Sequence, residues 1–188
     1  SSIALLPVHS EDYERGLENA PDHHRRWLES AGFKAAPGKW CGLPGTDGEL
    51  EAYVFGMQDS GWLYQLASLP AILPAGRYRL VCVWDKDRRI QASIGWGLAS
   101  YKFDRYVKSS REKPVLCLED DIADAVDSVI GAQSQVRDMI NTPTEDLGPP
   151  YLADAARREA DRFHARSKIN GVDDLLSENY PAVHAVGR

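Results

Sequence analysis

Short apolar runs alternate with segments of helical periodicity along most of the chain. The clearest run is residues 78–84, which predicts a buried strand over Arg77–Trp84. The clearest helical segment is Ile90–Tyr106, whose apolar residues form two stripes. Two stripes indicate a helix that is covered on more than one side. Alternating strands and helices predict an α/β fold, with a mainly parallel or mixed sheet and helices on its faces.

Periodicity and helix breakers predict the remaining elements. The other expected strands are residues 3–8, 39–43, 50–57, 114–118, 168–170 and 182–186. The other expected helices are a stretch after Asp12 and residues 22–30, 61–69, 122–140, 150–164 and 172–179. Small residues in the 90–106 helix would let a neighbour approach closely: Ala92, Gly95, Gly97, Ala99 and Ser100. In the 150–164 helix, the residues expected to face inward are Leu152, Ala156, Ala160 and Phe163.

Composition narrows the class of protein. The chain has 188 residues and a net charge of −6, so nothing favours nucleic-acid binding globally. No apolar run reaches the ~18 residues of a membrane span, and the first residues lack the basic region of a signal peptide. Cys41, Cys82 and Cys117 are odd in number and far apart, which indicates reduced thiols in a cytoplasmic protein.

A proline-rich corner interrupts the helical pattern late in the chain. Asn141 can end a helix in a left-handed conformation, and Pro143 cannot continue one. Gly148 is flexible, and Pro149-Pro150 pre-set the backbone for a new helix. The corner is therefore rigid, either as a turn within one domain or as a fixed hinge between two domains.

Three ordered stretches resemble the leucyl aminopeptidase family, the cytosol aminopeptidases. Residues 137–143 (RDMINTP), followed by Leu147-Gly148-Pro149 and Leu152-Ala153, resemble the family's junction between its N-terminal and catalytic domains. Residues 97–106 (GLASYKFDRY) resemble its Gly-x-Tyr-x-Phe-Asp-x-Tyr helix, and residues 175–176 with 181–188 resemble the strand that opens its catalytic domain. The resemblance runs from about Gly95 to Arg188; before that only the α/β pattern matches.

The resemblance implies a fold and an activity. It implies a three-layer α/β/α, macrodomain-like N-terminal domain with a mixed sheet over residues 1–140. Residues 141–188 would be the junction turn and the first segment of a second α/β domain. The family consists of metallo-exopeptidases that release N-terminal amino acids from peptides. Two divalent ions (manganese, zinc or magnesium) polarise the peptide carbonyl and lower the pKa of a bridging water. The N-terminal domain would contribute to hexamer assembly and to active-site access.

The family's metal-binding runs are missing from this sequence. They are a Lys-Gly-x-x-x-Asp-Thr-Gly-Gly-like run and an Asn-Thr-Asp-Ala-Glu-Gly-Arg-like run, and neither occurs here. In Asn141–Glu145, Pro143 stands where the second run has an Asp ligand. We therefore expect an N-terminal fragment that is inactive alone and carries no catalytic, metal or cofactor residue. Its expected partners are its own catalytic domain, further copies of the chain and, in the parent, peptide substrate, with no nucleic acid and no membrane.

Several local features suggest other sites, and each has a simpler structural explanation. His23-His24-Arg25-Arg26 suggests a metal or phosphate site, but adjacent helical residues do not face each other, so a solvated helix face is preferred. Asp85–Asp87 follows a strand where ligands often sit, yet a polar turn explains it. Glu119–Asp121 could hold a cation, although negative charge suits a helix N-terminus without one.

Other candidates lack an essential part. Gly95-Trp96-Gly97 lacks the third glycine of a dinucleotide fingerprint and falls inside a helix. Neither Ser93, Ser100 nor the cysteines have the His arrangement of nucleophilic catalysis. Core packing is expected for the five tryptophans: Trp27, Trp40, Trp62, Trp84 and Trp96. A small basic patch is expected to complement a helix end: Arg105, Lys108, Arg111 and Lys113.

Two alternatives to the peptidase fragment remain at this point. A macrodomain-like fold could bind ADP-ribose-like ligands, although no Gly-rich phosphate loop is visible at a strand–helix junction. A regulatory or assembly module is the other alternative. In a truncated chain, Val183, Ala185 and Val186 would form apolar surface that a missing domain covers.

Overall fold

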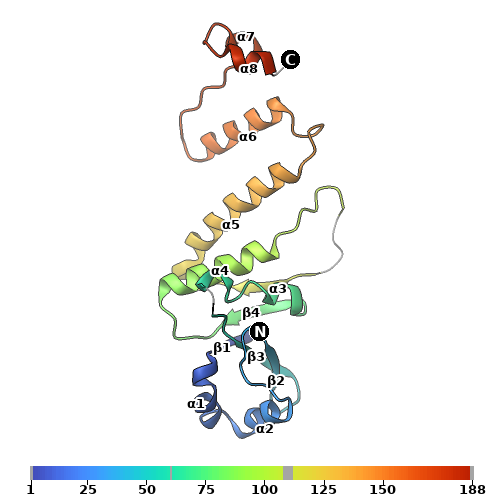
Figure 1. Ribbon diagram of the computed structural model, residues 1–188, viewed down its shortest axis with the longest axis vertical. Coiled ribbons are helices and arrows are strands. Elements are labelled where there is room, and N and C mark those ends of the chain that lie inside the picture. The colour runs from blue at the N-terminus through green and yellow to red at the C-terminus, as the bar shows by residue number, and fades with distance from the viewer. Residues whose placement is uncertain (1, 60, 108–111, 187–188) are drawn as a thin grey trace. The chain divides into compact units, whose positions relative to one another are not determined.

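The computed structural model describes residues 2–59, 61–107 and 112–186 (Figure 1). The chain divides into two compact units, Ser1–Asp138 and Met139–Arg188. Lys108, Arg111, Gly187 and Arg188, which belong to the sequence motifs, lie outside the described residues. In the described part of the chain, no helix is long and apolar enough to cross a membrane.

A five-stranded mixed sheet forms the centre of the first unit, in the order β2-β3-β1-β4-β5. Its strands are β1 (Ile3–Val8), β2 (Trp40–Pro44), β3 (Leu50–Gly56), β4 (Gly76–Leu80) and β5 (Pro114–Cys117). β1 pairs in parallel with β3 and β4, and β4 with β5. Only β2 runs antiparallel, because a short turn at Gly45–Gly48 connects it to β3.

Helices lie on both faces of this sheet. The helices of the first unit are η1 (Ser10–Asp12), α1 (Tyr13–Glu18), α2 (Asp22–Ser30), η2 (Trp62–Tyr64), α3 (Leu69–Ile72), α4 (Lys86–Ser100) and the greater part of α5 (Asp120–Asn141). Figure 1 shows α1 and α2 on one side of the strands and α3 and α4 on the other.

Two separate cores fill the spaces between these layers. Successive strand residues point to opposite faces, so Ala4 belongs to one core and its neighbour Leu5 to the other. The core under α1 and α2 contains Tyr13 and Leu28, and the core under η2, α3 and α4 contains Leu66 and Trp96. The first unit is therefore a three-layer α/β/α domain with a mixed sheet, as predicted.

Two predicted boundaries around β4 are wrong. The strand ends at Leu80 instead of Trp84, because its pairing with β1 and β5 ends there, and Val83 is fully exposed. The next helix begins at Lys86 instead of Ile90, because the Asp85 carboxylate accepts a hydrogen bond from the Arg88 N–H at 2.9 Å and caps it. The apolar run is thus divided between a strand and a loop.

Other boundaries also differ. The helix expected to reach Tyr106 ends at Ser100, because Tyr101 adopts an extended backbone. The helix expected over residues 61–69 is a short 3-10 turn followed by α3, in which Pro70 occupies the first turn, where its missing N–H costs nothing.

The second unit contains α6 (Pro149–Arg162), α7 (Val172–Leu175) and α8 (Pro181–Val186). The strand expected at residues 182–186 is a helix that Pro181 opens, and residues 168–170 are irregular. Within the described part of this unit, a strand would find no neighbouring strand to pair with. The inward face predicted for α6 is also wrong for Leu152 and Phe163, which are more than half exposed.

Candidate functional site

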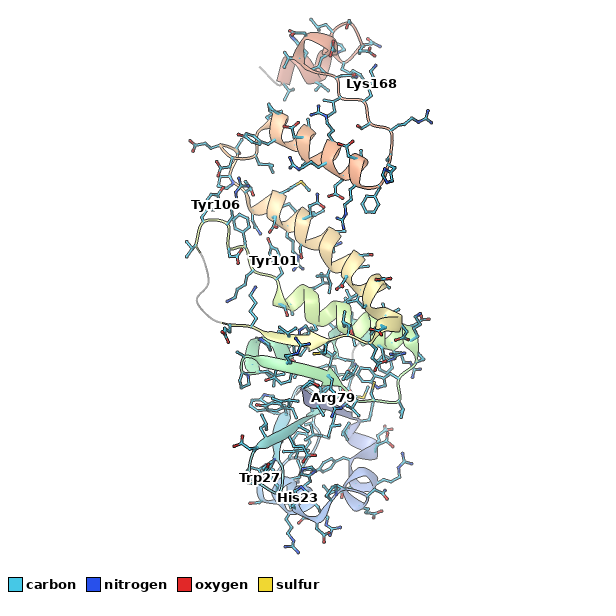
Figure 2. All side chains as sticks on the ribbon, turned by 180° about the vertical axis from the view of Figure 1, so that it is seen from behind. His23, Trp27, Arg79, Tyr101, Tyr106 and Lys168 are labelled. Atoms are coloured by element: carbon cyan, nitrogen blue, oxygen red, sulfur yellow. The ribbon has the colours of Figure 1, made fainter. Side chains whose placement is uncertain are left out.

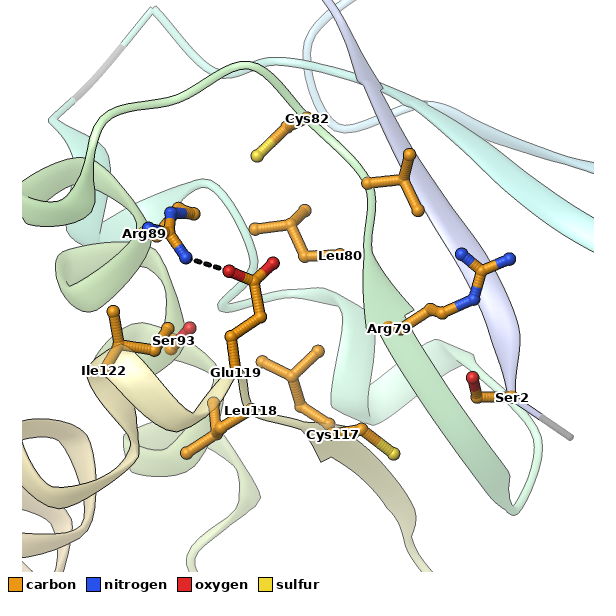
Figure 3. A pocket seen from close by; sticks show the side chains of 12 residues that line it. Ser2, Arg79, Leu80, Cys82, Arg89, Ser93, Cys117, Leu118, Glu119 and Ile122 are labelled. Carbon is orange, nitrogen blue, oxygen red and sulfur yellow. Dashed lines mark hydrogen bonds and ion pairs between the residues drawn. The ribbon is translucent and has the colours of Figure 1, made fainter.

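A cavity of about 470 Å³ opens at the carboxyl ends of β4 and β5 (Figure 3). β4 contributes Arg79, β5 contributes Cys117, and the loop after β4 contributes Cys82. Arg89 comes from the start of α4. Glu119 enters from the residue just before α5. Ligands of open α/β sheets bind at this edge, so the position of the cavity is that of a candidate site.

Arg89 dominates the electrostatics of this cavity. Its guanidinium forms an ion pair with Glu119 and donates from Nη2 to Asp121 Oδ2 at 2.9 Å and from Nη1 to Asp121 Oδ1 at 3.2 Å. Its side chain is only 16% exposed. The sequence predicted the carboxylates as charges at a helix N-terminus, but their partner lies about 30 residues earlier and carries no local signal.

These pairings shift the acid–base behaviour of the cavity. The hydrogen bond from Arg89 lowers the pKa of Asp121 below its ordinary value, and the same bond raises the pKa of Arg89. Burial raises the pKa of the Cys82 thiol, so this thiol is less reactive than an ordinary cysteine. The guanidinium is already matched by two carboxylates, which would also repel a phosphate. Among the described lining residues, Arg89 is therefore committed to two carboxylates, and Arg79 is the other cation that lines the cavity.

The Asp85–Asp87 loop is structural. Asp85 caps α4 and pairs with Arg88 at 3.1 Å, and the Arg88 guanidinium lies 4.6 Å from the centre of the Trp62 ring. Trp62 in turn meets Trp84 edge to face. The polar turn preferred from the sequence is thus a helix cap.

Four residues, Leu98, Tyr101, Arg137 and Asp138, form what we call the clasp. The Tyr101 hydroxyl donates to Asp138 Oδ1 at 2.8 Å, and Arg137 Nη1 donates to the Leu98 carbonyl at 2.7 Å. The Arg137 guanidinium lies 5.2 Å from the centre of the Tyr101 ring. Figure 2 shows Tyr101 just beyond the end of α4. The clasp joins the two sequence motifs, residues 97–106 and residues 137–143, that carried the family resemblance.

Two glycines explain why α4 can be packed on two sides. A Cβ at Gly95 would lie 1.8 Å from the Leu63 carbonyl oxygen, and a Cβ at Gly97 would lie 2.0 Å from Ile130 Cδ1. Small residues are therefore needed for close approach, as predicted. Both glycines lie inside α4, which agrees with the rejection of a dinucleotide fingerprint.

His23 and His24 differ from the expected solvated helix face. His24 is only 8% exposed, and its ring centre lies 4.1 Å from that of His23. Glu51 approaches both, and one ligand atom from each of the three residues lies within 4.8 Å of the others. Glu51 stands 27 positions from His24, so sequence spacing could not reveal the group.

Core packing accounts for only some of the tryptophans. Trp96 is a core residue, but Trp27 and Trp40 are 48% and 43% exposed, so core packing was the wrong prediction for these two. Trp40 is the first residue of the edge strand β2 and packs edge to face on Tyr53. Trp27 lies beside this strand, where its indole donates to the Gly42 carbonyl at 2.8 Å. All three cysteines are free.

The basic patch is only partly described. The Lys113 ammonium donates to the Ser100 carbonyl at 3.4 Å, at the carboxyl end of α4, which agrees with the expected role at a helix end. Arg105 lies over the Tyr106 ring at 5.7 Å. Lys108 and Arg111 fall outside the described residues.

The fold and the clasp together define a class: a three-layer α/β domain with a mixed sheet whose last helix is fastened to α4. Residues 3–119 match the family model described as "M17 aminopeptidase, N-terminal domain". The match covers more than half of the 188 residues. The chain therefore belongs to the M17 aminopeptidase family and contains its N-terminal domain.

Solved structures agree with this assignment. The chain is 28% identical to the cytosol aminopeptidase of Coxiella burnetii, with a TM-score of 0.85 over 94% of this chain and 39% of that one. The bottromycin maturation enzyme BotP in complex with Mn is 23% identical, with a TM-score of 0.63 over 86% of this chain and 36% of that one. A mutant of tomato leucine aminopeptidase is 14% identical, with a TM-score of 0.60 over 87% of this chain and 40% of that one. The chain thus spans about two fifths of the length of these proteins.

Proposed function

We propose that this chain is the non-catalytic N-terminal part of a metal-dependent aminopeptidase that releases N-terminal amino acids from peptides. The observation that carries the proposal is the match of residues 3–119 to the N-terminal domain of the M17 family. The alignment with the Coxiella burnetii enzyme supports it, because 94% of this chain corresponds to only 39% of that enzyme. The chemistry would then reside in the remainder of the parent protein.

The described residues do not fit a two-metal peptidase centre. The group with metal-ligand geometry in the described part of the chain is His23, His24 and Glu51, which offers two imidazoles and one carboxylate to one ion. The family's centre requires several carboxylates and a lysine, as the resemblance implies. We therefore assign the two divalent ions of the parent to residues beyond this chain. The Mn complex of BotP supports manganese as one of the candidates, besides zinc and magnesium.

Within the parent, this domain would act on assembly and on access to the active site. The proposal includes a cytoplasmic homo-hexamer in which the domain contacts its own catalytic domain and binds neither nucleic acid nor membrane. The clasp supports such a role, because it fastens the end of α5 to the residues at the end of α4 within the first unit.

The test compares residues 1–188 with the longer parent protein. Both are assayed with a leucyl chromogenic substrate in the presence of Mn²⁺, and activity is followed across a size-exclusion profile to exclude a contaminant. We expect turnover from the parent at the elution position of an oligomer and no turnover from the isolated chain. Turnover that coelutes with the isolated chain would refute its non-catalytic assignment. A parent without aminopeptidase activity would refute the proposed function.

A further inference from the structure

We propose that His23, His24 and Glu51 form a binding site for one zinc-like transition-metal cation. One ligand atom from each residue lies within 4.8 Å of the other two. Two imidazole nitrogens and a carboxylate oxygen are a common ligand set for Zn²⁺, and three protein ligands leave a fourth position for water. The inference concerns the first unit alone and is independent of the proposed peptidase function.

The site is built by two elements that the fold holds together. His23 and His24 are in the first turn of α2, and Glu51 is the second residue of β3. The Trp27 indole, one turn further along α2, donates to the Gly42 carbonyl of β2 at 2.8 Å. β2 pairs with β3 along its length, and the Gly45 N–H donates to the Glu49 carbonyl at 2.7 Å across the turn. The ligands therefore do not depend on a mobile loop for their proximity.

The surroundings of His24 favour a cation. Its Nε2 lies 3.2 Å from the Pro44 carbonyl oxygen and 3.5 Å from Glu51 Oε2. A neutral imidazole can offer only one N–H, and here two acceptors compete for it. Among the described residues, the ion pair recorded for Glu51 is the one with His24. The nearby Arg25 is already engaged with Asp22. A metal ion would serve as the common partner of the imidazoles and the carboxylate.

The geometry needs only a small contraction to accept the ion. Ligand atoms about 2.0–2.2 Å from a tetrahedral zinc lie roughly 3.3 Å from one another, and here they lie within 4.8 Å. His24 is buried and fixed, whereas His23 and Glu51 are exposed and can rotate toward it. A site with two imidazole ligands also binds Zn²⁺ much more tightly than Mn²⁺, because affinity at such sites rises along the series from Mn²⁺ toward Cu²⁺.

The test is calorimetric titration of the chain with Zn²⁺, using conservative variants of the exposed ligands. We expect one Zn²⁺ per chain. His23→Gln and Glu51→Gln should each weaken zinc affinity about 100-fold or more, since losing even a second-shell partner costs ~10–100-fold. These two side chains are exposed, so the variants should keep the fold, which far-UV circular dichroism checks. Mn²⁺ in the same titration should bind at least 10-fold more weakly than Zn²⁺.

Two control variants distinguish this site from zinc bound elsewhere. Glu49→Gln removes an exposed carboxylate two residues away on the same hairpin, and His164→Gln removes an exposed imidazole of the second unit. Both should bind zinc like the unmodified chain. The proposal is overturned by an absence of stoichiometric binding, or by binding that survives in His23→Gln and Glu51→Gln. Loss of binding in either control would also overturn it, because the cation would then lie elsewhere.

Discussion

Arg89 joins the start of α4 to the start of α5 through two ion pairs. It is 16% exposed and holds Glu119 and Asp121 at the start of α5 from a position in the first turn of α4. A charged side chain with this little exposure is favoured while its partners remain ionised, because an unpaired and partly buried charge is costly. We call Arg89, Glu119 and Asp121 the clamp. It links α4 to the start of α5 by ion pairs, so its contribution to stability should depend on pH.

We expect Arg89→Met to lower the free energy of unfolding, and to do so in a pH-dependent way. Arg89 lowers the pKa of Asp121 in the folded chain below the ordinary value of 3.8. A carboxylate with a depressed folded pKa stabilises the fold above its unfolded pKa, and this stabilisation is lost as pH falls through the folded value. Urea unfolding of both proteins should show a difference at pH 7 that shrinks as pH falls below about 4.

Arg15→Met is the matched control for this prediction. Arg15 pairs with Asp12 at 2.7 Å, but both side chains are more than half exposed. Such a pair is worth only about 0–1 kcal/mol, so the control should change stability little. Equal effects of the two variants, or an Arg89→Met effect that is constant from pH 7 to pH 3, would contradict the clamp.

Residue-level sites were the least predictable part of the chain. Patterning correctly placed Glu119–Asp121 at a helix start, since that depends on local sequence alone. It could not supply Arg89 as their partner, nor Glu51 as the neighbour of the two histidines. Both contacts arise from the packing of elements distant in sequence, and no periodicity encodes which side chains then meet.

At the scale of elements, the clasp holds the end of α5 against the end of α4 within the first unit. It combines a hydrogen bond from Tyr101, a second from Arg137, and the position of the Arg137 guanidinium over the Tyr101 ring. Gly97 adds close packing, because its missing side chain admits Ile130 of α5. Hydrogen bonds and packing act at the same helix pair, so loss of one contact should loosen the end of α5 before the rest of the domain.

We expect Tyr101→Phe to destabilise the chain by about 1 kcal/mol, the usual net value of one hydrogen bond. The ring remains under Arg137, whereas the hydroxyl that donates to Asp138 is removed. Amide hydrogen exchange should accelerate most in residues 134–138. Tyr64→Phe is the control, since Tyr64 is 57% exposed and its change should cost less than ~0.5 kcal/mol. Uniform acceleration across α4 and α5 would argue against a local clasp.

Helices and strands could be predicted from the sequence where a local pattern alone determines their bounds. Residues 3–8 and 22–30 were placed correctly, because a short apolar run and a proline-opened helix are local patterns. The boundaries around β4 were wrong because strand length depends on the partners, and α4 begins where Asp85 can cap it. The predicted strand over residues 182–186 is a helix, and the described part of the second unit offers no strand for it to pair with.

At the scale of the whole molecule, the two units differ in how much side chain they bury. The first unit has two cores, one on each face of its sheet. In the described part of the second unit, Thr142 and Ala155 are the buried residues, whereas Val183 and Val186 are 56% and 87% exposed. The apolar exposure predicted for residues 183–186 is thus observed. Local stability follows buried apolar contact, so residues 139–188 should open far more readily than residues 1–138.

Limited trypsin digestion should therefore separate the two units. Cleavage is expected first at Arg157, Arg158, Arg166 and Lys168, which are exposed and belong to the second unit. A fragment containing the three-layer domain should persist, because its cleavage requires unfolding of a packed core.

If the longer parent covers the apolar side chains of residues 139–188, as the proposed function requires, these same sites should be cut more slowly in the parent. Mass spectrometry of the digests gives the sites and their rates. Equal rates in the chain and the parent would mean that the rest of the protein does not cover this surface, and the proposed contact with the catalytic domain would have to be placed elsewhere.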